Sequence, residues 1–398
     1  MPAGRAGPPP STATLPGMLG NESLVAPAHS VHIREPLVLD CGRTLAGYTL
    51  SFETYGRLSP AADNAVLVCH SLTGTAHAAG RHGRADQRRG WWDGAIGPGR
   101  MIDTNRYFVI CSDALAAGAS TGPRQADPAT GRPYGLSFPV ITIRDMVTAQ
   151  RGLLDCLGIA RLHAVIGGCM GGQQALEWAI AQPEAVRSAV VITTTPATSA
   201  HSIAIFAVMR RLIRSDPAWN GGDYYDGQPP HRGLGDAITA AVPLWMSRAA
   251  MEARFGRRTA DPAPGYSLGH EFAVEAFIEQ LASRAHSEID PNGLLYLTRA
   301  VEYFDLAAEY GGIDRAVAPV TASVLFVSYR EDWRYPAAET EILHRALRDA
   351  GADSRHLVLD SAMGHGAFIY DLAGLAGPVG AFLAGQPAGA VTAGQASC

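Results

Sequence analysis

The stretch HAVIGGCMGGQQALEWA, residues 163–179, combines an apolar run, a cysteine between glycines and a run with helical spacing. Its centre, GGCMG at residues 167–171, matches the pattern glycine–any–nucleophile–any–glycine, with cysteine as the nucleophile. The pattern predicts a sharp turn from a strand into a helix, with Cys169 at the helix N-terminus. Backbone N–H groups there favour an anion, so the thiol is expected to ionise readily and act as a nucleophile. A buried, inert thiol is the alternative, because free cysteine often packs as a small apolar residue.

Outside this stretch, short apolar runs alternate with helical patterns. Runs of this length without polar interruptions are typical of strands that are buried on both faces of a parallel sheet. The runs are 64–70, 107–115, 162–168, 188–194 and 322–329. Residues 143–159 and 338–351 have helical spacing and can cross over between parallel strands. The sequence therefore predicts an α/β fold with a mostly parallel central sheet and helices on both faces.

The strand signal disappears between about residues 196 and 318, where helical patterns and polar loops take over. We predict a helical lid inserted at 196–318 between two parts of an α/β core, 31–195 and 319–385. The two ends of the chain, 1–30 and 386–398, are rich in Pro, Gly, Ala and Ser and are predicted to be disordered tails.

The composition excludes several function classes. The formal net charge is -5 and no basic block is present, so we expect no nucleic-acid or anionic-membrane partner. All 32 Lys and Arg residues are Arg, which excludes chemistry that needs a lysine. No apolar run approaches the roughly 18 residues of a membrane span, and the N-terminus lacks the apolar core of a signal peptide. The six cysteines form no CxxC pair, so a reduced, cytoplasmic protein is expected.

Partners for Cys169 follow it in the chain order nucleophile, acid, histidine. Asp332 comes directly after the apolar run 322–329, with Glu331 and Asp305 as alternatives for the acid. His365 lies between glycines in a loop that follows another short predicted strand. His365 would deprotonate the thiol or form an ion pair with it, and Asp332 would orient the imidazole.

An oxyanion hole needs two backbone N–H groups near the reacting carbonyl. One is the N–H of the residue after the nucleophile, Met170, and the other is expected near Leu72 in HSLTG, residues 70–74. His70, His77 and His82 also raise the possibility of a metal site. Since they occur in a turn without the spacing of helical metal ligands, we predict no metal.

Long stretches of the chain resemble the homoserine O-acetyltransferase family of α/β-hydrolase-fold enzymes, over roughly residues 35–380. The stretches include NAVLVCHSLTG (64–74), GGCMGGQQALEWA (167–179), DPAWNGGDYY (216–225), NGLLYLTRAVEYFD (292–305) and LFVSYREDWRYP (325–336). The resemblance implies acyl transfer from acyl-CoA to a hydroxyl through an acyl-enzyme, without another cofactor. It also implies a homodimer formed through the helical lid. The family's nucleophilic serine falls on Cys169, its acid on Asp332 and its histidine on His365.

The chain departs from the family pattern in the acceptor site. The Asp that normally follows the catalytic histidine, and resembles the group that holds the acceptor's ammonium, is Gly366 here. The lid Arg that resembles a carboxylate clamp falls on Ile238, and a nearby lid His falls on Val242. Phe206 replaces another polar residue, and Arg210 lies one helical turn beyond it. These five residues are our predicted acceptor pocket. Four of them, Gly366, Ile238, Val242 and Phe206, carry no polar side chain, which predicts an acceptor other than homoserine, such as a specialised metabolite.

Other functions stay open at this point. Arg210, Arg211 or Arg248 could rebuild the clamp, which would leave an ordinary homoserine or serine O-acyltransferase. A thioesterase or other hydrolase would use water as the acceptor, and a scaffold would not need the three catalytic residues at all. The sequence does not choose among acyl chain lengths, or between CoA and a carrier protein as the donor.

Overall fold

The computed structural model describes residues 25–385 except 84–85, 87, 261–265, 267, 270 and 286–288. The predicted C-terminal tail, 386–398, and residues 1–24 of the N-terminal one lie outside the described residues. Residues 25–30, predicted to belong to the tail, are instead part of the fold. Ala26 is buried and its N–H donates to the carbonyl of Arg81 at 3.0 Å, and the first strand begins at His29. The sequence does not indicate this strand, because its residues are mostly polar and exposed and form no apolar run.

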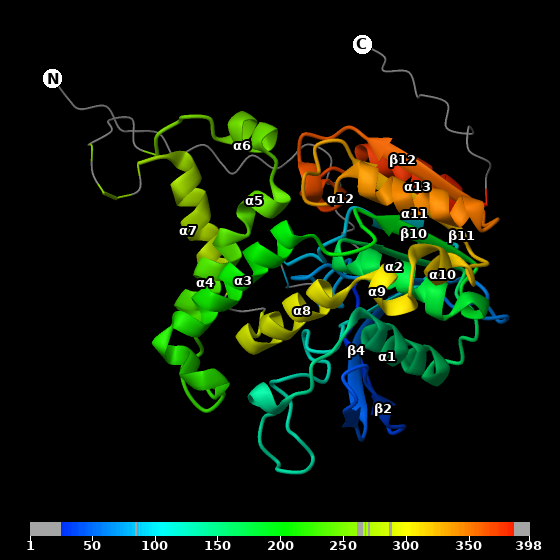
Figure 1. Ribbon diagram of the computed structural model, residues 1–398, viewed down its shortest axis with the longest axis horizontal. Helices are drawn as coiled ribbons and strands as arrows, with labels where there is room; N and C mark the ends of the chain where they lie inside the picture. Colours follow the sequence, from blue (N-terminus) through cyan, green and yellow to red (C-terminus); the bar gives the residue numbers. More distant parts are fainter. Residues whose placement is uncertain are drawn as a thin grey trace.

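A central sheet of eight strands forms the core of the molecule (Figure 1). Its order is β1 (His29–Ile33), β4 (Tyr48–Tyr55), β8 (Phe108–Ser112), β5 (Ala65–Cys69), β9 (Ala164–Gly168), β10 (Ser188–Ile192), β11 (Ser323–Tyr329) and β12 (Ser354–Leu359). The strands from β8 to β12 are parallel, whereas β4 is antiparallel to β8 and to β1. Two small pairs, β2 (Leu37–Val38) with β3 (Thr44–Leu45) and β6 (Ile96–Gly97) with β7 (Ile102–Asp103), lie outside this sheet.

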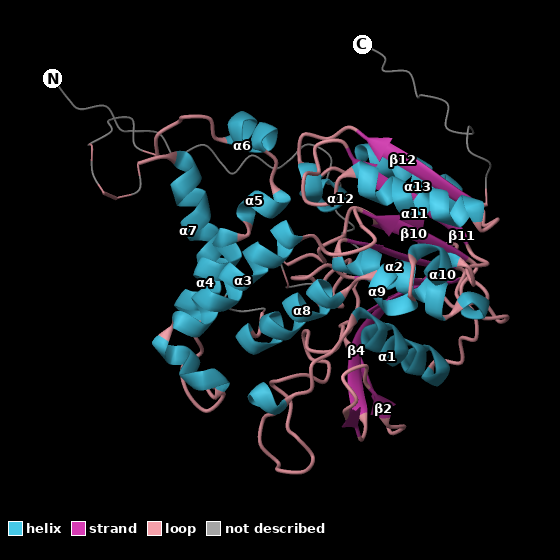
Figure 2. Ribbon diagram, viewed as in Figure 1, coloured by secondary structure: helices cyan, strands magenta, loops and turns pink. Residues whose placement is uncertain are grey.

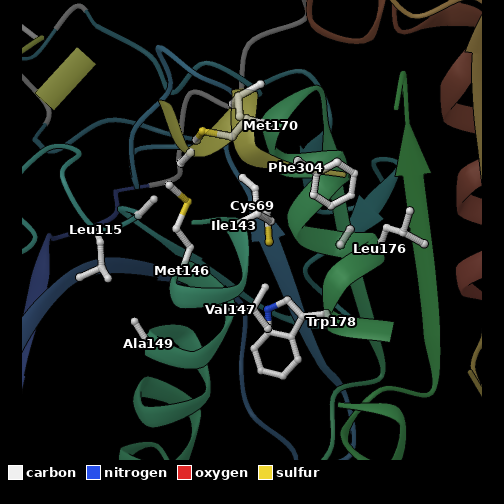
Figure 3. Packing of buried hydrophobic residues seen from close by; sticks show 14 of the residues in the cluster. Cys69, Leu115, Ile143, Met146, Val147, Ala149, Met170, Leu176, Trp178 and Phe304 are labelled. Carbon is white, nitrogen blue, oxygen red and sulfur yellow. The ribbon is translucent and has the colours of Figure 1, made fainter. Parts of the chain in front are cut away.

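Helices cover both faces of the sheet, as the buried apolar strands predict. Alternate residues of β5, β9 and β10 enter two different apolar clusters, because successive side chains of a strand point to opposite faces. One cluster includes α1 (Ile143–Cys156), α2 (Met170–Ala181) and α11 (Ala337–Asp349). The other includes α12 (Ala367–Tyr370) and α13 (Ala373–Leu383). Figure 3 shows the first cluster, where Val147 of α1 lies beside Trp178 of α2.

The segment between β10 and β11 contains only helices and loops among its described residues, which agrees with the predicted helical insertion (Figure 2). Its helices are α3 (Ala200–Ser215), α4 (His231–Ala240), α5 (Val242–Trp245), α6 (Arg248–Arg254), α7 (Ala273–Ala285), α8 (Pro291–Tyr303), α9 (Leu306–Tyr310) and α10 (Ile313–Val317). A 3₁₀ turn, Pro217–Gly222, joins α3 to the segment before α4. α4 packs between α3 and α7, to the side of the sheet (Figure 1).

The last two helices of this segment belong with the core and not with the lid. α10 contacts α11, and the Tyr310 hydroxyl of α9 donates to the carboxylate of Glu177 at 2.7 Å. Arg144 of α1 forms an ion pair with Glu309 of α9 at 2.8 Å. The chain therefore returns to the core near residue 306, earlier than the predicted boundary at 318.

Within the described residues, no single helix has the length and apolar character to cross a membrane. The bent pair Gly364–Tyr370 and Ala373–Leu383 meets those two criteria only when its halves are taken together.

Candidate active site

Cys169 occupies the predicted turn between β9 and α2. Its backbone has φ 60° and ψ -123°, a conformation that is rare for residues other than glycine and that often marks functional sites. A Cβ atom on Gly171 would lie 2.1 Å from the carbonyl oxygen of Cys69, and one on Gly167 would lie 2.3 Å from the carbonyl of Gly171. Only glycine therefore lets the strand and the helix approach closely enough to form the turn. The thiol lies at the N-terminus of α2, as the sequence predicts.

His365 and Asp332 meet as the chain order predicts. Nδ1–H of His365 donates to Oδ2 of Asp332 at 2.8 Å, and both side chains are buried. The other Asp332 oxygen, Oδ1, accepts the backbone N–H groups of Arg334 and Tyr335, each at 3.0 Å. These bonds orient the carboxylate toward the imidazole. Nε2 of His365 has no well-aligned partner among the described residues, so it is available to a reacting group.

The two alternative acids do not contact the histidine. Asp305 accepts the backbone N–H of Ala308 and caps the N-terminus of α9. Glu331 is exposed. Asp332 is therefore the acid of this site by its geometry.

Charges around Cys169 favour the thiolate. Burial by itself would raise the thiol pKa, but the nearby charges of Arg334 and His365, together with the Met170 N–H, lower it from 9.0 to about 7. Burial would lower the pKa of His365, but Asp332 and Cys169 outweigh that effect and raise it from 6.5 to about 9. The lowered thiol pKa and the raised imidazole pKa both favour a thiolate–imidazolium pair.

The predicted oxyanion-hole residues lie beside the thiol. The N–H of Met170 helps to lower the pKa of the Cys169 thiol, and Leu72 lines the same pocket as Cys169. His70 braces this loop, because its Nδ1–H donates to the carbonyl of Ser71 at 2.8 Å and its Nε2 accepts the Ala114 N–H at 2.9 Å. Burial lowers the pKa of His70, which keeps the ring neutral for these two bonds. His70 is thus a supporting residue of the oxyanion loop.

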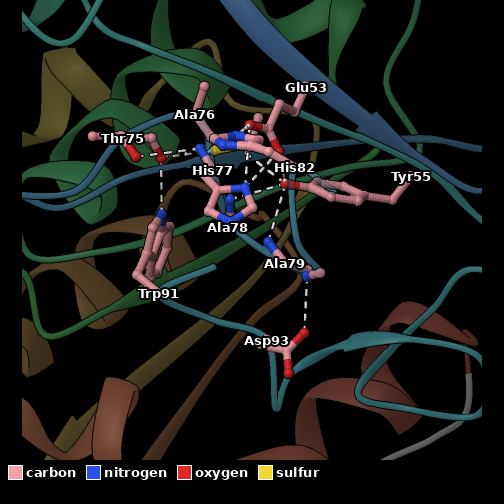
Figure 4. A network of polar contacts seen from close by, with 12 residues as sticks. Glu53, Tyr55, Thr75, Ala76, His77, Ala78, Ala79, His82, Trp91 and Asp93 are labelled. Carbon is pink, nitrogen blue, oxygen red and sulfur yellow. Dashed lines mark hydrogen bonds and ion pairs between the residues drawn. The ribbon is translucent and has the colours of Figure 1, made fainter. Parts of the chain in front are cut away.

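The other two histidines of the sequence analysis surround a buried carboxylate that the sequence did not single out, Glu53 of β4 (Figure 4). Glu53 accepts hydrogen bonds from Nδ1 of His77 at 2.9 Å, Nε2 of His82 at 2.7 Å and the hydroxyl of Tyr55 at 2.8 Å. Burial would raise the pKa of Glu53, but these bonds lower it. The ligand atoms of the three residues lie within 4.8 Å of one another, a spacing that a metal ion could also use. In the structure their hydrogen bonds tie β4 to the chain that follows the oxyanion loop.

A pocket opens at Cys169 between the core and the lid. Three of the predicted acceptor residues, Phe206, Ile238 and Gly366, line it. Among the described residues no Asp or Glu lines it, and most of the remaining wall is apolar, from Met209, Ala241, Leu244, Trp245, Leu281, Phe368 and Ile369.

The other two predicted acceptor residues do not line the pocket. Arg210 turns toward α8, where its Nη1 donates to Glu302 at 2.7 Å and to Thr298 at 3.2 Å. A guanidinium is far more stable beside a carboxylate than unpaired, so this ion pair holds the side chain away from the acceptor site. Val242 is buried in a separate lid cluster with Met246, Ala250 and Phe255.

The other two arginines that could have rebuilt the clamp, Arg211 and Arg248, are exposed and do not line the pocket. The arginine that does line it is Arg334, which the sequence analysis did not single out. Arg334 follows Asp332 by two residues and is 7% exposed. Its guanidinium lies 5.1 Å from the centre of the Phe206 ring and 4.9 Å from that of Tyr335. Nothing local in the sequence distinguishes it from a solvent-exposed loop arginine.

Comparisons with known proteins agree with the geometry. Residues 64–372 match the alpha/beta hydrolase fold family. The chain is 44% identical over 350 residues to a homoserine O-acetyltransferase of Methanosphaerula palustris, covering 87% of this chain and 71% of that protein. It is 43% identical over 353 residues to a homoserine O-acetyltransferase of Solidesulfovibrio magneticus, covering 87% and 89%.

Solved structures show the same likeness. Homoserine O-acetyltransferase from Bacillus anthracis superimposes with a TM-score of 0.84 at 31% identity, covering 90% of this chain and 98% of that one. Esterase E22 superimposes with a TM-score of 0.82, also at 31% identity, covering 90% and 100%. The chain therefore belongs to the homoserine O-acetyltransferase family of α/β-hydrolase-fold enzymes and is an acyltransferase.

Proposed function

We propose that the enzyme transfers an acyl group from acyl-CoA, through a thioester on Cys169, to the hydroxyl of a small acceptor. The observation that carries this proposal is the buried Cys169 at the turn, beside the hydrogen-bonded pair of His365 and Asp332. No cofactor is needed besides acyl-CoA as co-substrate. Because the thiol must stay reduced, we place the enzyme in the cytoplasm.

In the first half-reaction the Cys169 thiolate attacks the thioester carbonyl of acyl-CoA. The oxyanion that forms accepts hydrogen bonds from the N–H groups of Met170 and Leu72. Collapse of this intermediate breaks the bond to the CoA sulfur, and the His365 imidazolium protonates that sulfur as it leaves. The products are free CoA, a neutral thioester on Cys169 and a neutral imidazole.

In the second half-reaction Nε2 of His365 accepts the proton of the acceptor hydroxyl while its oxygen attacks the Cys169 thioester. The same oxyanion hole stabilises the second tetrahedral intermediate. Its collapse releases the ester and restores the thiolate and the imidazolium. Asp332 stabilises the imidazolium at both stages through its bond to Nδ1.

The pocket supports an acceptor other than homoserine. The ammonium group of an amino acid needs an anion or several acceptors when it is buried, and the described lining provides no carboxylate. Gly366 adds no side chain beside His365, and a Cβ there would lie 2.9 Å from the carbonyl of Trp245. We therefore infer an acceptor that lacks an ammonium group.

Hydrolysis is a second candidate, supported by the similarity to esterase E22 over nearly the whole fold. An acyl-enzyme on Cys169 would form in the same way, but water would then take the acyl group. The two candidates share the first half-reaction and differ in what removes the acyl group.

The test is intact mass spectrometry of the protein after incubation with acetyl-CoA and longer acyl-CoAs. We expect an adduct of one acyl group that Cys169→Ala removes, whereas Cys156→Ala, which removes an exposed thiol, leaves it unchanged. No adduct with any donor, or an adduct that survives in Cys169→Ala, contradicts the proposal. Multiple turnovers of CoA release without an acceptor favour hydrolysis instead.

A further inference from the structure

The Arg334 guanidinium is a buried cation that lines the pocket. Among the described residues, no Asp or Glu oxygen lies within the 4.0 Å of an ion pair with it, and its Nε has no hydrogen-bond partner. Within the part of the chain that the structure describes, its only side-chain hydrogen bond is a long one, 3.4 Å, from Nη2 to the Tyr335 hydroxyl. The buried Arg210 of the neighbouring lid helix is different, because Glu302 neutralises it.

A guanidinium is costly to bury when no carboxylate is paired with it, because it gives up its hydration for weaker interactions. The faces of Phe206 and Tyr335 recover part of that loss through cation–π contacts. Aromatic faces leave the N–H donors in the guanidinium plane unused, and these donors suit a planar anion such as a carboxylate. The pocket therefore has a preformed place for an anion.

The charge opposite Arg334 changes during the proposed reaction. In the free enzyme the charge of the Cys169 thiolate raises the pKa of the guanidinium, so the two charges stabilise each other. In the acyl-enzyme that sulfur is part of a neutral thioester, so Arg334 loses its counter-charge at the stage at which the acceptor binds.

We propose that Arg334 binds a carboxylate of the acceptor, which makes the acceptor a hydroxy acid without an ammonium group. This proposal rests on the proposed function, because the proposed function is what makes the bound molecule the acceptor. The apolar wall formed by Ile238, Ala241 and Leu244 fits the hydrocarbon part of such a molecule. Arg334 takes the carboxylate from the core side of the pocket, whereas the family's lid arginine position is Ile238 here.

The experiment measures binding by calorimetry to Cys169→Ala, whose uncharged side chain resembles the acyl-enzyme in charge. The probes are 4-hydroxybutyrate, its neutral analogue 4-hydroxybutyramide, and homoserine, which adds an ammonium. We expect 4-hydroxybutyrate to bind on the order of 10- to 100-fold more tightly than the amide, as for a hydrogen-bonded charge pair. Homoserine should bind no better than the amide, because its ammonium has no partner.

Arg334→Gln in the same background should abolish the preference for the carboxylate, and Arg248→Gln, an exposed arginine outside the pocket, should keep it. Arg334→Lys keeps the charge without the planar pair of donors, so it should retain a smaller preference. If a thermal melt shows that Arg334→Gln does not fold, Arg334→Lys serves as the test in its place. Equal affinities for acid and amide, or a preference that both Arg334 variants leave unchanged, overturns the inference.

The inference and the proposed function fail separately. An acyl adduct on Cys169 without any carboxylate preference refutes only the role of Arg334. A carboxylate preference lost in Arg334→Gln, without an adduct from any acyl donor, supports the anion site and refutes the acyl-transfer proposal. A third outcome, in which Arg334→Gln raises only the pH at which the Cys169 thiol of the otherwise unaltered enzyme reacts, assigns Arg334 to the thiolate alone and overturns the inference.

Discussion

Cys169 shows how two neighbouring side chains can reverse the effect of burial on a thiol pKa. A thiol that is 3% exposed should be hard to ionise, yet the positive charges of His365 and Arg334 lower its pKa to about 7. The charge on His365 depends in turn on Asp332, which is one reason why its pKa is raised to about 9. The reactivity of Cys169 is therefore set by residues more than 150 positions away in the chain.

The first prediction concerns the reactivity of Cys169 toward iodoacetamide. Because the thiolate is the reactive form and its pKa is lowered, alkylation should persist well below pH 8.5 and decline as the pH falls through about 7. Asp332→Asn removes the anion that stabilises the imidazolium, so it should move the whole profile to higher pH. The profile is measured by mass spectrometry of the peptide that contains Cys169.

The exposed Cys156 of the same sample serves as the comparison thiol, because it lies outside the pocket. If both cysteines show the same profile, with reaction rising only near pH 8.5, Cys169 has no ion-pair partner. An Asp332→Asn profile equal to that of the unaltered enzyme would likewise refute the role of the acid.

At the scale of elements, the turn between β9 and α2 depends on close packing of backbone against backbone. Gly171 approaches the end of β5, and Gly167 approaches the first turn of α2. The three elements come together at Cys169 because neither position carries a side chain. This packing aims the N–H groups of the first turn of α2 at the active site.

The second prediction tests that packing with Gly171→Ala. The new Cβ would lie 2.1 Å from the backbone oxygen of Cys69, which cannot move without disturbing β5. We expect a loss of at least about 1–3 kcal/mol in the free energy of unfolding, together with a large loss of acyl transfer. Denaturant unfolding and the acyl-adduct assay measure the two effects.

Gly374→Ala in α13 is the matched control. A Cβ there meets only the Leu359 side chain, at 3.8 Å, and alanine favours a helix by about 1 kcal/mol over glycine. Its stability should be unchanged or higher. A Gly171→Ala protein as stable and active as this control would show that the turn tolerates a side chain.

At the scale of the whole molecule, the lid completes a site whose reactive groups all come from the core. Phe206 of α3 and Ile238 of α4 form the wall opposite Cys169 and His365. The outer side of α3 carries exposed apolar residues, Ile203, Ala204, Ala207 and Val208. We propose that two copies of the chain pair through this side of α3, so that dimerisation stabilises the lid.

The third prediction follows from that proposal. The protein should sediment with the mass of two chains, and Ala207→Glu with Val208→Glu should convert it to single chains, because four buried carboxylates would face each other across the interface. Ile342→Glu, on an exposed apolar residue of α11 in the core, should leave the dimer intact. Sedimentation equilibrium that shows single chains of the unaltered protein would contradict the pairing.

Much of the fold could be predicted because it depends on local patterns. Strands such as β5, β9 and β10 are buried throughout, so each appears in the sequence as a continuous apolar run. Strand β1 could not be found in this way, because it lies at the edge of the sheet and most of its residues are exposed. The pattern of apolar residues indicates burial. An edge strand is stabilised mainly by backbone hydrogen bonds, so this pattern does not reveal it.

The sequence by itself determined the α/β architecture, the helical insertion, the cysteine turn and the order of Cys169, Asp332 and His365. Each of these depends on spacing and residue type within a short segment, or on strand ends that must meet at one edge of a parallel sheet. Only the tertiary structure decided which arginine lines the pocket, because Arg210 pairs with Glu302 on another helix, whereas Arg334 is ion-paired with no carboxylate of the described residues. Neutralisation of a buried charge depends on residues brought together from distant parts of the chain, and local sequence does not show which they are.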